Sequence, residues 1–165
     1  MIKKTNSRVI EKEVILASIK HSIKSELLNH LEQKIKDISN AVKSLTESRD
    51  TDTKSSAGDK HETSRAKIQT EIDQLSKQLN HIRRQKNNLS AIDTSHLHSI
   101  ADVGSLVKTD KGYFFISICL GRIQIQDEIY FVISIASPIG RLLKYKKKGD
   151  SIQFKNMSYD VLSVG

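Results

Sequence analysis

The sequence predicts an α+β protein in which two long helices come before a small β domain. On either side of a polar stretch at residues 47–65, apolar residues recur at steps of three and four, which is typical of helices with a narrow apolar stripe. After Asp102 the apolar pattern changes to a period of two, which is typical of strands. Together these observations predict a helical domain over residues 1–95 and a β domain over residues 100–165.

The two apolar stripes predict an antiparallel two-helix coiled coil. Before the polar stretch the stripe residues are Leu27, Leu31, Ile35, Ile38, Val42 and Leu45, and after it they are Ile68, Ile72, Leu75, Leu79, Ile82 and Leu89. Water penalises an uncovered stripe, and the nearest cover for each helix is the other helix. Residues 15–45 alone would extend about 45 Å as a helix, so the polar turn at 47–65, here called the tip, would lie at the far end.

The helix boundaries follow from local signals. The first helix is expected over about residues 9–47, because this stretch has no Gly or Pro, and the residues before it are expected to fray. Asp and Thr side chains then compete for backbone hydrogen bonds and favour a turn. Ser55 or Ser56 is expected to cap the second helix, which should continue to about residue 91. Lys86 occupies a stripe position, where a polar residue often fixes the register of a helix pair.

The β domain is predicted from short runs of β-branched and aromatic residues separated by turn residues. Strands are expected at 105–109, 113–119, 122–126, 129–135, 152–154 and 159–164. Ser137 and Pro138 have the form of an N-cap followed by proline in the first helical position, so a short helix is expected over 139–145. We expect a compact antiparallel sheet that carries this one helix over a modest core.

Composition narrows the class of protein further. The hydrophobic fraction is 37% and the aromatic fraction 5%, which suits a helix pair with a small module better than one large core. The net charge of +8 favours an anionic partner. The apolar run at 14–19 is too short for a signal peptide or a membrane span. Cys119 is the only cysteine and is expected to pack in the core, and its isolation fits a reducing cytoplasm. We therefore expect a cytoplasmic protein with no membrane partner.

Motifs for common enzyme chemistries are absent from the sequence. There is no Gly-rich phosphate loop, no HExxH and no zinc spacing, and His96 with His98 forms an HxH pair without further ligands at a suitable spacing. The tip is the only concentrated set of reactive side chains, and its acids are Asp50, Asp52, Asp59 and Glu62. Paired carboxylates can hold Mg²⁺. The carboxylate of Asp59 could equally cap the second helix. Exposed carboxylates alone bind Mg²⁺ weakly, so any chemistry at the tip would take place inside another protein's site.

The order of these parts resembles the Gre family of bacterial transcription elongation (transcript cleavage) factors. Residues 100–107 read IADVGSLV, and residues 137–150 read SPIGRLLKYKKKGD, which is similar to the family signature SPIARALIGKKVGD. The resemblance covers nearly the whole chain. It implies an FKBP-like C-terminal domain that docks at the rim of the secondary channel of RNA polymerase. It also implies a coiled coil that reaches down this channel to the polymerase active site.

The resemblance also implies roles for particular residues. In the family, acids of the tip help to hold a catalytic Mg²⁺ and a water molecule while the polymerase cleaves backtracked RNA. The implied catalytic residues are Asp59, Glu62, Asp52 and Asp50, with Asp59 and Glu62 as ligands of a Mg²⁺ shared with the polymerase. The residues implied in polymerase binding are Ser137, Pro138, Ile139, Arg141, Lys144, Lys147 and Lys148. The protein would bind no cofactor alone, and it would be an accessory factor rather than an enzyme, with RNA polymerase and, indirectly, the RNA 3′ end as its partners.

The tip departs from the family pattern, which is roughly DLSENAEY. When the serine of that pattern is laid on Ser55, Thr53 and Ser56 fall at the acid positions and Asp59 matches the later Glu. Two hypotheses therefore stay open: a factor that stimulates RNA cleavage, and a non-catalytic regulator that occupies the channel. A third is a structural adaptor or a general binder of DNA or RNA backbone, and it is less favoured because the helices have no aromatic residues on which bases could stack.

Overall fold

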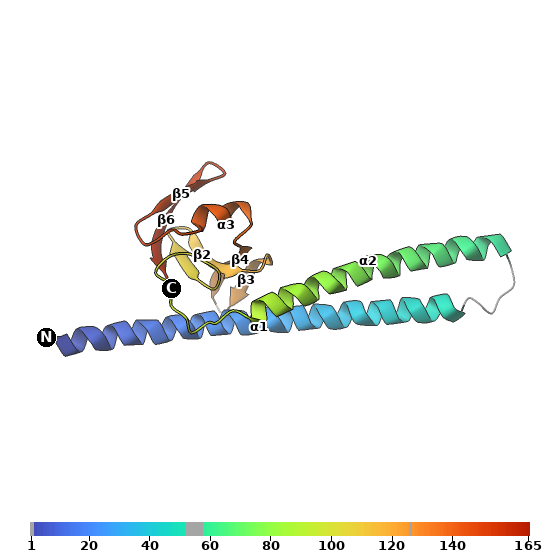
Figure 1. Cartoon of the computed structure of the whole chain (residues 1–165), viewed down its shortest axis with the longest axis horizontal. Helices are drawn as coiled ribbons and strands as arrows, with labels where there is room; N and C mark the ends of the chain where they lie inside the picture. Colours follow the sequence, from blue (N-terminus) through green and yellow to red (C-terminus); the bar gives the residue numbers. More distant parts are fainter. Residues whose placement is uncertain (1, 52–57, 126) are drawn as a thin grey trace. The chain divides into compact units, whose positions relative to one another are not determined.

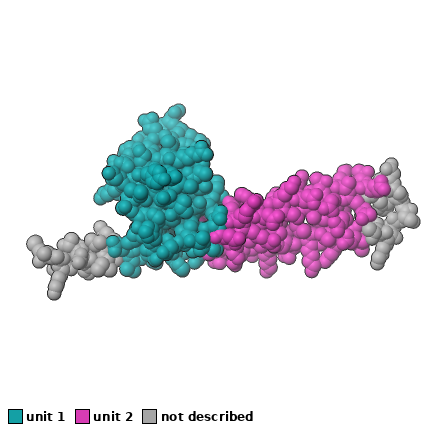
Figure 2. Space-filling view, in the orientation of Figure 1, with its two compact units in different colours: residues 1–26, 88–165 teal, residues 27–87 magenta. Residues whose placement is uncertain are grey.

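The computed structural model describes residues 2–51, 58–125 and 127–165, and the side chains of all of these except 2–12 and 58–61. It shows an α+β protein (Figure 1). The elements are α1 (Ile2–Thr51), α2 (Gly58–Ser90), β1 (Leu106–Thr109), β2 (Gly112–Ser117), β3 (Gly121–Ile125), β4 (Glu128–Ser134), α3 (Pro138–Leu143), β5 (Ser151–Phe154) and β6 (Met157–Val164). Two compact units are formed, a sheet unit of residues 1–26 with 88–165 and a helix unit of residues 27–87 (Figure 2).

In the helix unit the predicted stripe residues are less exposed than most of the residues between them. Leu27 and Leu31 are 1% and 0% exposed, and Ile72 is 8% exposed. The other stripe residues of this unit are half-buried, namely Ile35, Ile38, Val42, Leu45, Ile68, Leu75, Leu79 and Ile82. Partial burial of this kind is expected where two helices cover only one stripe of each other.

Two polar contacts define how the helices run in this unit. Lys86 Nζ lies 2.8 Å from Glu32 Oε1, and an Arg49 guanidinium nitrogen donates to Gln69 Oε1 at 2.6 Å. On α1, Arg49 follows Glu32 by 17 residues, and on α2 their partners are also 17 residues apart but in the reverse order, with Gln69 before Lys86. The two helices are therefore antiparallel here and keep one register. Lys86, which interrupts the stripe, therefore pairs directly with the opposite helix.

Helix α1 is longer than the sequence predicts. It begins at Ile2 rather than near residue 9 and continues to Thr51, four residues beyond the expected end. No Gly or Pro interrupts this stretch, and the Thr51 hydroxyl donates to the Glu47 carbonyl one turn earlier, so the side chain expected to break the helix bonds within it. Helix α2 begins at Gly58, and the predicted caps Ser55 and Ser56 lie outside the described residues.

The six strands form one mixed sheet in the order β3-β4-β2-β1-β6-β5. The prediction of a wholly antiparallel sheet is wrong at one pair, because β2 and β4 are parallel, with Tyr113 opposite Tyr130. Strand β4 is strongly apolar, and its Tyr130 and Val132 are buried, so an inner position is favourable for it. Strand β3 exposes Arg122 and Gln124 and is left at the sheet edge, where only β4 pairs with it.

Helix α3 covers a core built on one face of the sheet. The buried members of this core are Ala101, Val107, Phe114, Ile116, Leu143, Ile152, Tyr159 and Val161. As predicted, Ser137 caps α3, because its hydroxyl accepts a hydrogen bond from the Gly140 backbone N–H at 3.1 Å, and Pro138 takes the first helical position. Gly140 allows close approach, since a Cβ at this position would lie 2.1 Å from the Ser134 carbonyl oxygen.

Two lysines of α1 bind carbonyl oxygens in the segment that follows α2. Lys24 Nζ donates to Ser90 O at 2.8 Å and to Ile92 O at 2.6 Å, which satisfies carbonyl groups left free where α2 ends. Lys20 Nζ donates to His96 O, and the Lys20 side chain is 0% exposed. Burial lowers the pKa of Lys20, and the nearby charge of Asp93 opposes this effect. These bonds join the first part of α1 to the linker within the sheet unit.

His98 in the same linker is expected to make the sheet unit less stable at acid pH. Burial lowers the pKa of His98, the charges of Lys20 and His96 lower it further, and Asp102 opposes them. The unfolded chain therefore takes up a proton at higher pH than the folded chain, so stability falls as the pH falls through the ordinary histidine value of 6.5. The midpoint of unfolding, measured at about pH 7.5 and again at about pH 5.5, tests whether stability falls in this way. We expect a smaller acid-induced drop for His98→Gln than for the wild type, and equal drops would contradict the assignment.

Candidate functional site

The tip acids fall only partly within the described residues. Asp50 is exposed near the end of α1, where its carboxylate accepts a hydrogen bond from Arg49 Nε at 2.9 Å. Glu62 is exposed near the start of α2. Asp52 lies outside the described residues, and so does the side chain of Asp59, whose backbone belongs to the first turn of α2. The structure thus describes the two helix ends within the tip, and the arrangement of the four acids lies partly outside the described residues.

A metal site is not formed by the described side chains alone. Within this part of the chain, no group of three or more His, Cys, Asp or Glu residues is placed to hold a metal ion. The carboxylate of Asp50 is engaged by Arg49, and the rings of His96 and His98 meet edge to face with their centroids 4.5 Å apart. The described side chains alone therefore do not provide the ligand set of a Mg²⁺ ion.

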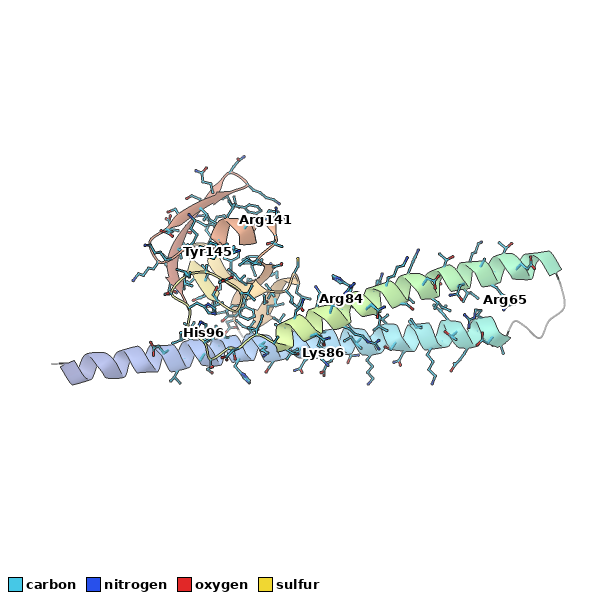
Figure 3. All side chains as sticks on the ribbon, in the orientation of Figure 1. Arg65, Arg84, Lys86, His96, Arg141 and Tyr145 are labelled. Carbon is cyan, nitrogen blue, oxygen red and sulfur yellow. The ribbon has the colours of Figure 1, made fainter. Side chains whose placement is uncertain are left out.

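The residues predicted to bind the polymerase extend from the N-cap of α3 to the turn that follows this helix in the sheet unit, and Figure 3 labels one of them, Arg141. Ile139 is half-buried and packs against the core, while Pro138 is exposed at the start of the helix. The basic cluster, defined as Arg141, Lys144, Lys147 and Lys148, is exposed. Ile139 and the buried Leu143 thus hold the helix on the sheet, and the charged part of the motif faces solvent.

Backbone hydrogen bonds fix the turn that carries the basic cluster. Lys146 N–H donates to Leu143 O at 2.9 Å, and Lys147 N–H donates to the Asp150 carboxylate at 2.9 Å. Ala101 makes two further backbone hydrogen bonds to this turn. Its N–H donates to Lys146 O at 2.7 Å, and its carbonyl oxygen accepts from Tyr145 N–H at 2.8 Å. The cationic side chains therefore project from a well-defined backbone, which lowers the entropic cost of binding a partner.

Within the basic cluster, the surroundings of Lys144 favour its charged form. The hydrogen bond and charge interaction with Tyr145 raise the pKa of Lys144, and the carboxylate of Asp102 raises it further. Lys144 Nζ also lies 4.6 Å from the centre of the Tyr145 ring, which is a cation–π distance. A positively charged surface of this kind attracts an acidic partner, with a strength that falls as salt concentration rises.

Sequence reasoning missed four apolar residues that are exposed beside or within the same motif. They are Ile100, Val103, Leu142 and Tyr145, with exposed fractions of 43%, 46%, 40% and 61%. Apolar residues at strand and helix spacing usually pack inward, so the sequence pattern alone does not indicate that these residues are exposed. One signal was available at Tyr145, where the Gre signature has a glycine.

Comparisons with protein-family models, with curated proteins and with solved structures gave no match for this chain. Among the described helices, none is both long and apolar enough to cross a membrane. The features that bear on function are therefore the motif at residues 137–150 and the geometry within each of the two units.

Proposed function

We propose that this chain is an accessory factor of transcription: a Gre-type elongation factor that binds RNA polymerase through its secondary channel and promotes cleavage of backtracked RNA. One observation carries the proposal, namely the motif at 137–150, which forms a capped helix held by buried Leu143 beneath an exposed basic cluster. Charge complementarity suits such a surface to an acidic protein. The resemblance of the motif to the Gre signature supplies the identity of that protein.

The helix unit supports a role inside a narrow channel. Its antiparallel contacts and its apolar stripe support a coiled coil, and the sheet with one short helix supports an FKBP-like domain. Each helix with its side chains is about 10–12 Å wide, so two packed helices are about 20 Å wide. A role inside a channel requires a narrow unit of this kind.

In this proposal the chain contributes only carboxylates to the chemistry. Asp59 and Glu62, or Asp50 and Asp52 in their place, would complete a Mg²⁺ site that belongs to the polymerase. A Mg²⁺ ion held there would supply an activated water for attack on a phosphodiester bond. The chain would then act without being an enzyme itself, in the cytoplasm, where the polymerase is.

A second candidate is a non-catalytic regulator that binds in the channel and controls access of nucleotides and backtracked RNA. This alternative is favoured by Asp50, whose carboxylate is already bonded to Arg49. It is also favoured by Thr53 and Ser56, which stand where the Gre pattern has acids. The tip would then act through its shape and charge.

A transcript-cleavage assay on backtracked elongation complexes with Mg²⁺ tests the proposal. We expect the wild-type protein to accelerate release of short 3′ RNA fragments. The double variant Asp59→Asn with Glu62→Gln should lose at least about tenfold in this stimulation, because two anionic ligands are replaced by neutral ones. Its affinity for the polymerase should be retained. Glu71→Gln, which neutralises an exposed acid farther along α2, is the matched control and should behave as the wild type.

The possible results separate the two candidates. Binding of the wild type without any stimulation of cleavage would favour the non-catalytic regulator. Undiminished stimulation by the double variant would show that Asp59 and Glu62 do not hold the metal. Failure of the wild type to bind the polymerase would overturn both candidates.

A further inference from the structure

Tyr145 is held in a backbone conformation that tyrosine rarely adopts. Its φ angle is 65°, in the left-handed region, at the position directly after the C-cap Lys144. Glycine is the usual residue there, because a side chain makes this conformation unfavourable. The Gre signature has glycine at the corresponding position, whereas this chain has tyrosine. With 61% of its surface exposed, the ring adds little to the core, so folding does not explain its presence.

Other exposed apolar residues lie beside Tyr145. The bonds of Ala101 to Tyr145 and Lys146, at 2.8 Å and 2.7 Å, place the loop at 100–103 directly against this turn. The loop exposes Ile100 and Val103, and Leu142 is exposed near the end of α3, three residues before Tyr145. We call Ile100, Val103, Leu142 and Tyr145 the apolar patch. Exposed apolar residues that come from neighbouring segments commonly mark a surface that another macromolecule covers.

Most charged residues near the apolar patch are positive. The basic cluster is in the same segment as Tyr145, and Figure 3 shows Arg141 and Tyr145 in the α3 region of the sheet unit. An apolar centre with a charged rim is the usual anatomy of a protein–protein interface, in which tyrosine is a frequent anchor. Nucleic acid is a poorer fit, because three of the four patch residues are aliphatic.

From these observations we infer that Tyr145 is the anchor by which the sheet unit docks on RNA polymerase, with Ile100, Val103 and Leu142 completing the contact. The partner surface is a protein surface with an apolar centre and acidic side chains around it. The inference rests on the proposed function for the identity of the partner, and it adds the residues that carry the affinity. It also explains why a strained tyrosine is kept where glycine would be more stable.

The substitution Tyr145→Gly tests the anchor without damaging the fold. Glycine adopts a φ of 65° without strain, so the unfolding midpoint of the full chain should stay the same or rise. The affinity for core RNA polymerase should nevertheless fall about tenfold or more, as expected for loss of an interface anchor. Wild-type affinity in this variant would overturn the inference while leaving the proposed function intact. Absence of polymerase binding by the wild type would overturn both.

A second pair of variants guards against an unexpected effect of Tyr145→Gly on folding. Val103→Ser alters the patch without changing the turn, and Met157→Ser alters an apolar residue of nearly equal exposure on β6, at 47% against 46%. Weaker polymerase binding by Val103→Ser than by Met157→Ser supports the patch, and equal binding by the two overturns it.

A labelled single-stranded RNA is the last probe. If Tyr145→Gly weakens binding to this RNA and leaves polymerase affinity unchanged, the assignment of a protein partner is overturned.

Discussion

Gly140→Ala is expected to destabilise the sheet unit by about 3 kcal/mol, the cost typical of forcing extra atoms into a packed site. The added Cβ would lie 2.1 Å from the Ser134 carbonyl oxygen and 3.0 Å from the Ile135 Cα. Both neighbours are backbone atoms at the end of β4, so no side-chain rotation can relieve the clash. Helix α3 would have to move away from the sheet, which would also disturb the cap made by Ser137.

Tyrosine fluorescence during urea unfolding measures this effect selectively. The chain has four tyrosines and no tryptophan, and every tyrosine lies in the sheet unit. The signal therefore reports on this unit even if the helix unit unfolds separately. Pro138→Ala is the control on the same helix, and we expect it to cost no more than about 1 kcal/mol. If Gly140→Ala is as stable as the wild type, α3 does not approach β4 as closely as the 2.1 Å distance indicates. The Gre signature has alanine at the position of Gly140, which makes this substitution informative.

Lys20→Ala should destabilise the sheet unit by about 2–4 kcal/mol, by analogy with other truncations of fully buried long side chains. The side chain of Lys20 is 0% exposed, so alanine leaves a cavity where its methylene groups were. The His96 carbonyl would also lose the donor that binds it, and an unpaired buried acceptor is costly. Loosening of this contact should make the first part of α1 more accessible to protease.

Lys20→Met separates the packing of this side chain from its charge. Methionine fills a similar volume and removes a buried cation, whose desolvation is unfavourable, so we expect its stability to stay within about 1 kcal/mol of the wild type. The same urea titration followed by tyrosine fluorescence measures both variants. Equal losses in Lys20→Met and Lys20→Ala would mean that the hydrogen bond to His96 dominates. No loss in either would contradict the burial of Lys20.

Local signals in the sequence predicted much of the fold. The spacing of Leu27, Leu31 and Ile72 indicated the buried stripes, and Ser137 with Pro138 indicated the start of α3. These features depend on residues close together in the chain, whose effect on backbone conformation is direct. The parallel pairing of β2 with β4 was not predictable in this way. Strand neighbours are chosen by competition for burial among distant segments, and a run of apolar residues does not say which neighbour it will have.

The candidate site was predictable in its charged part and not in its apolar part. Arg141 and Lys144 are exposed as charged residues of a helix end usually are. The exposure of Ile100 and Val103 depends on how the linker crosses the end of α3, which is a tertiary property. Lys20 shows the converse, because a single lysine on a long polar helix is expected to be solvated, and only the position of the His96 carbonyl explains its burial. For the tip, the sequence identifies the acids without fixing their geometry.

Because α1 and α2 keep one register in the helix unit, the length of this unit can change only if both helices change together. Glu32 with Lys86 and Arg49 with Gln69 are matched positions, so insertion of seven residues into each helix at matched points would retain the stripe and both contacts. Each such pair of insertions would lengthen the helix unit by about 10 Å. The length of this unit can therefore be changed in discrete steps, while the Tyr145 turn and the basic cluster stay as they are. Under the proposed function, the length that reaches into the channel and the surface that binds the polymerase would therefore be independent, and evolution or design could alter one without the other.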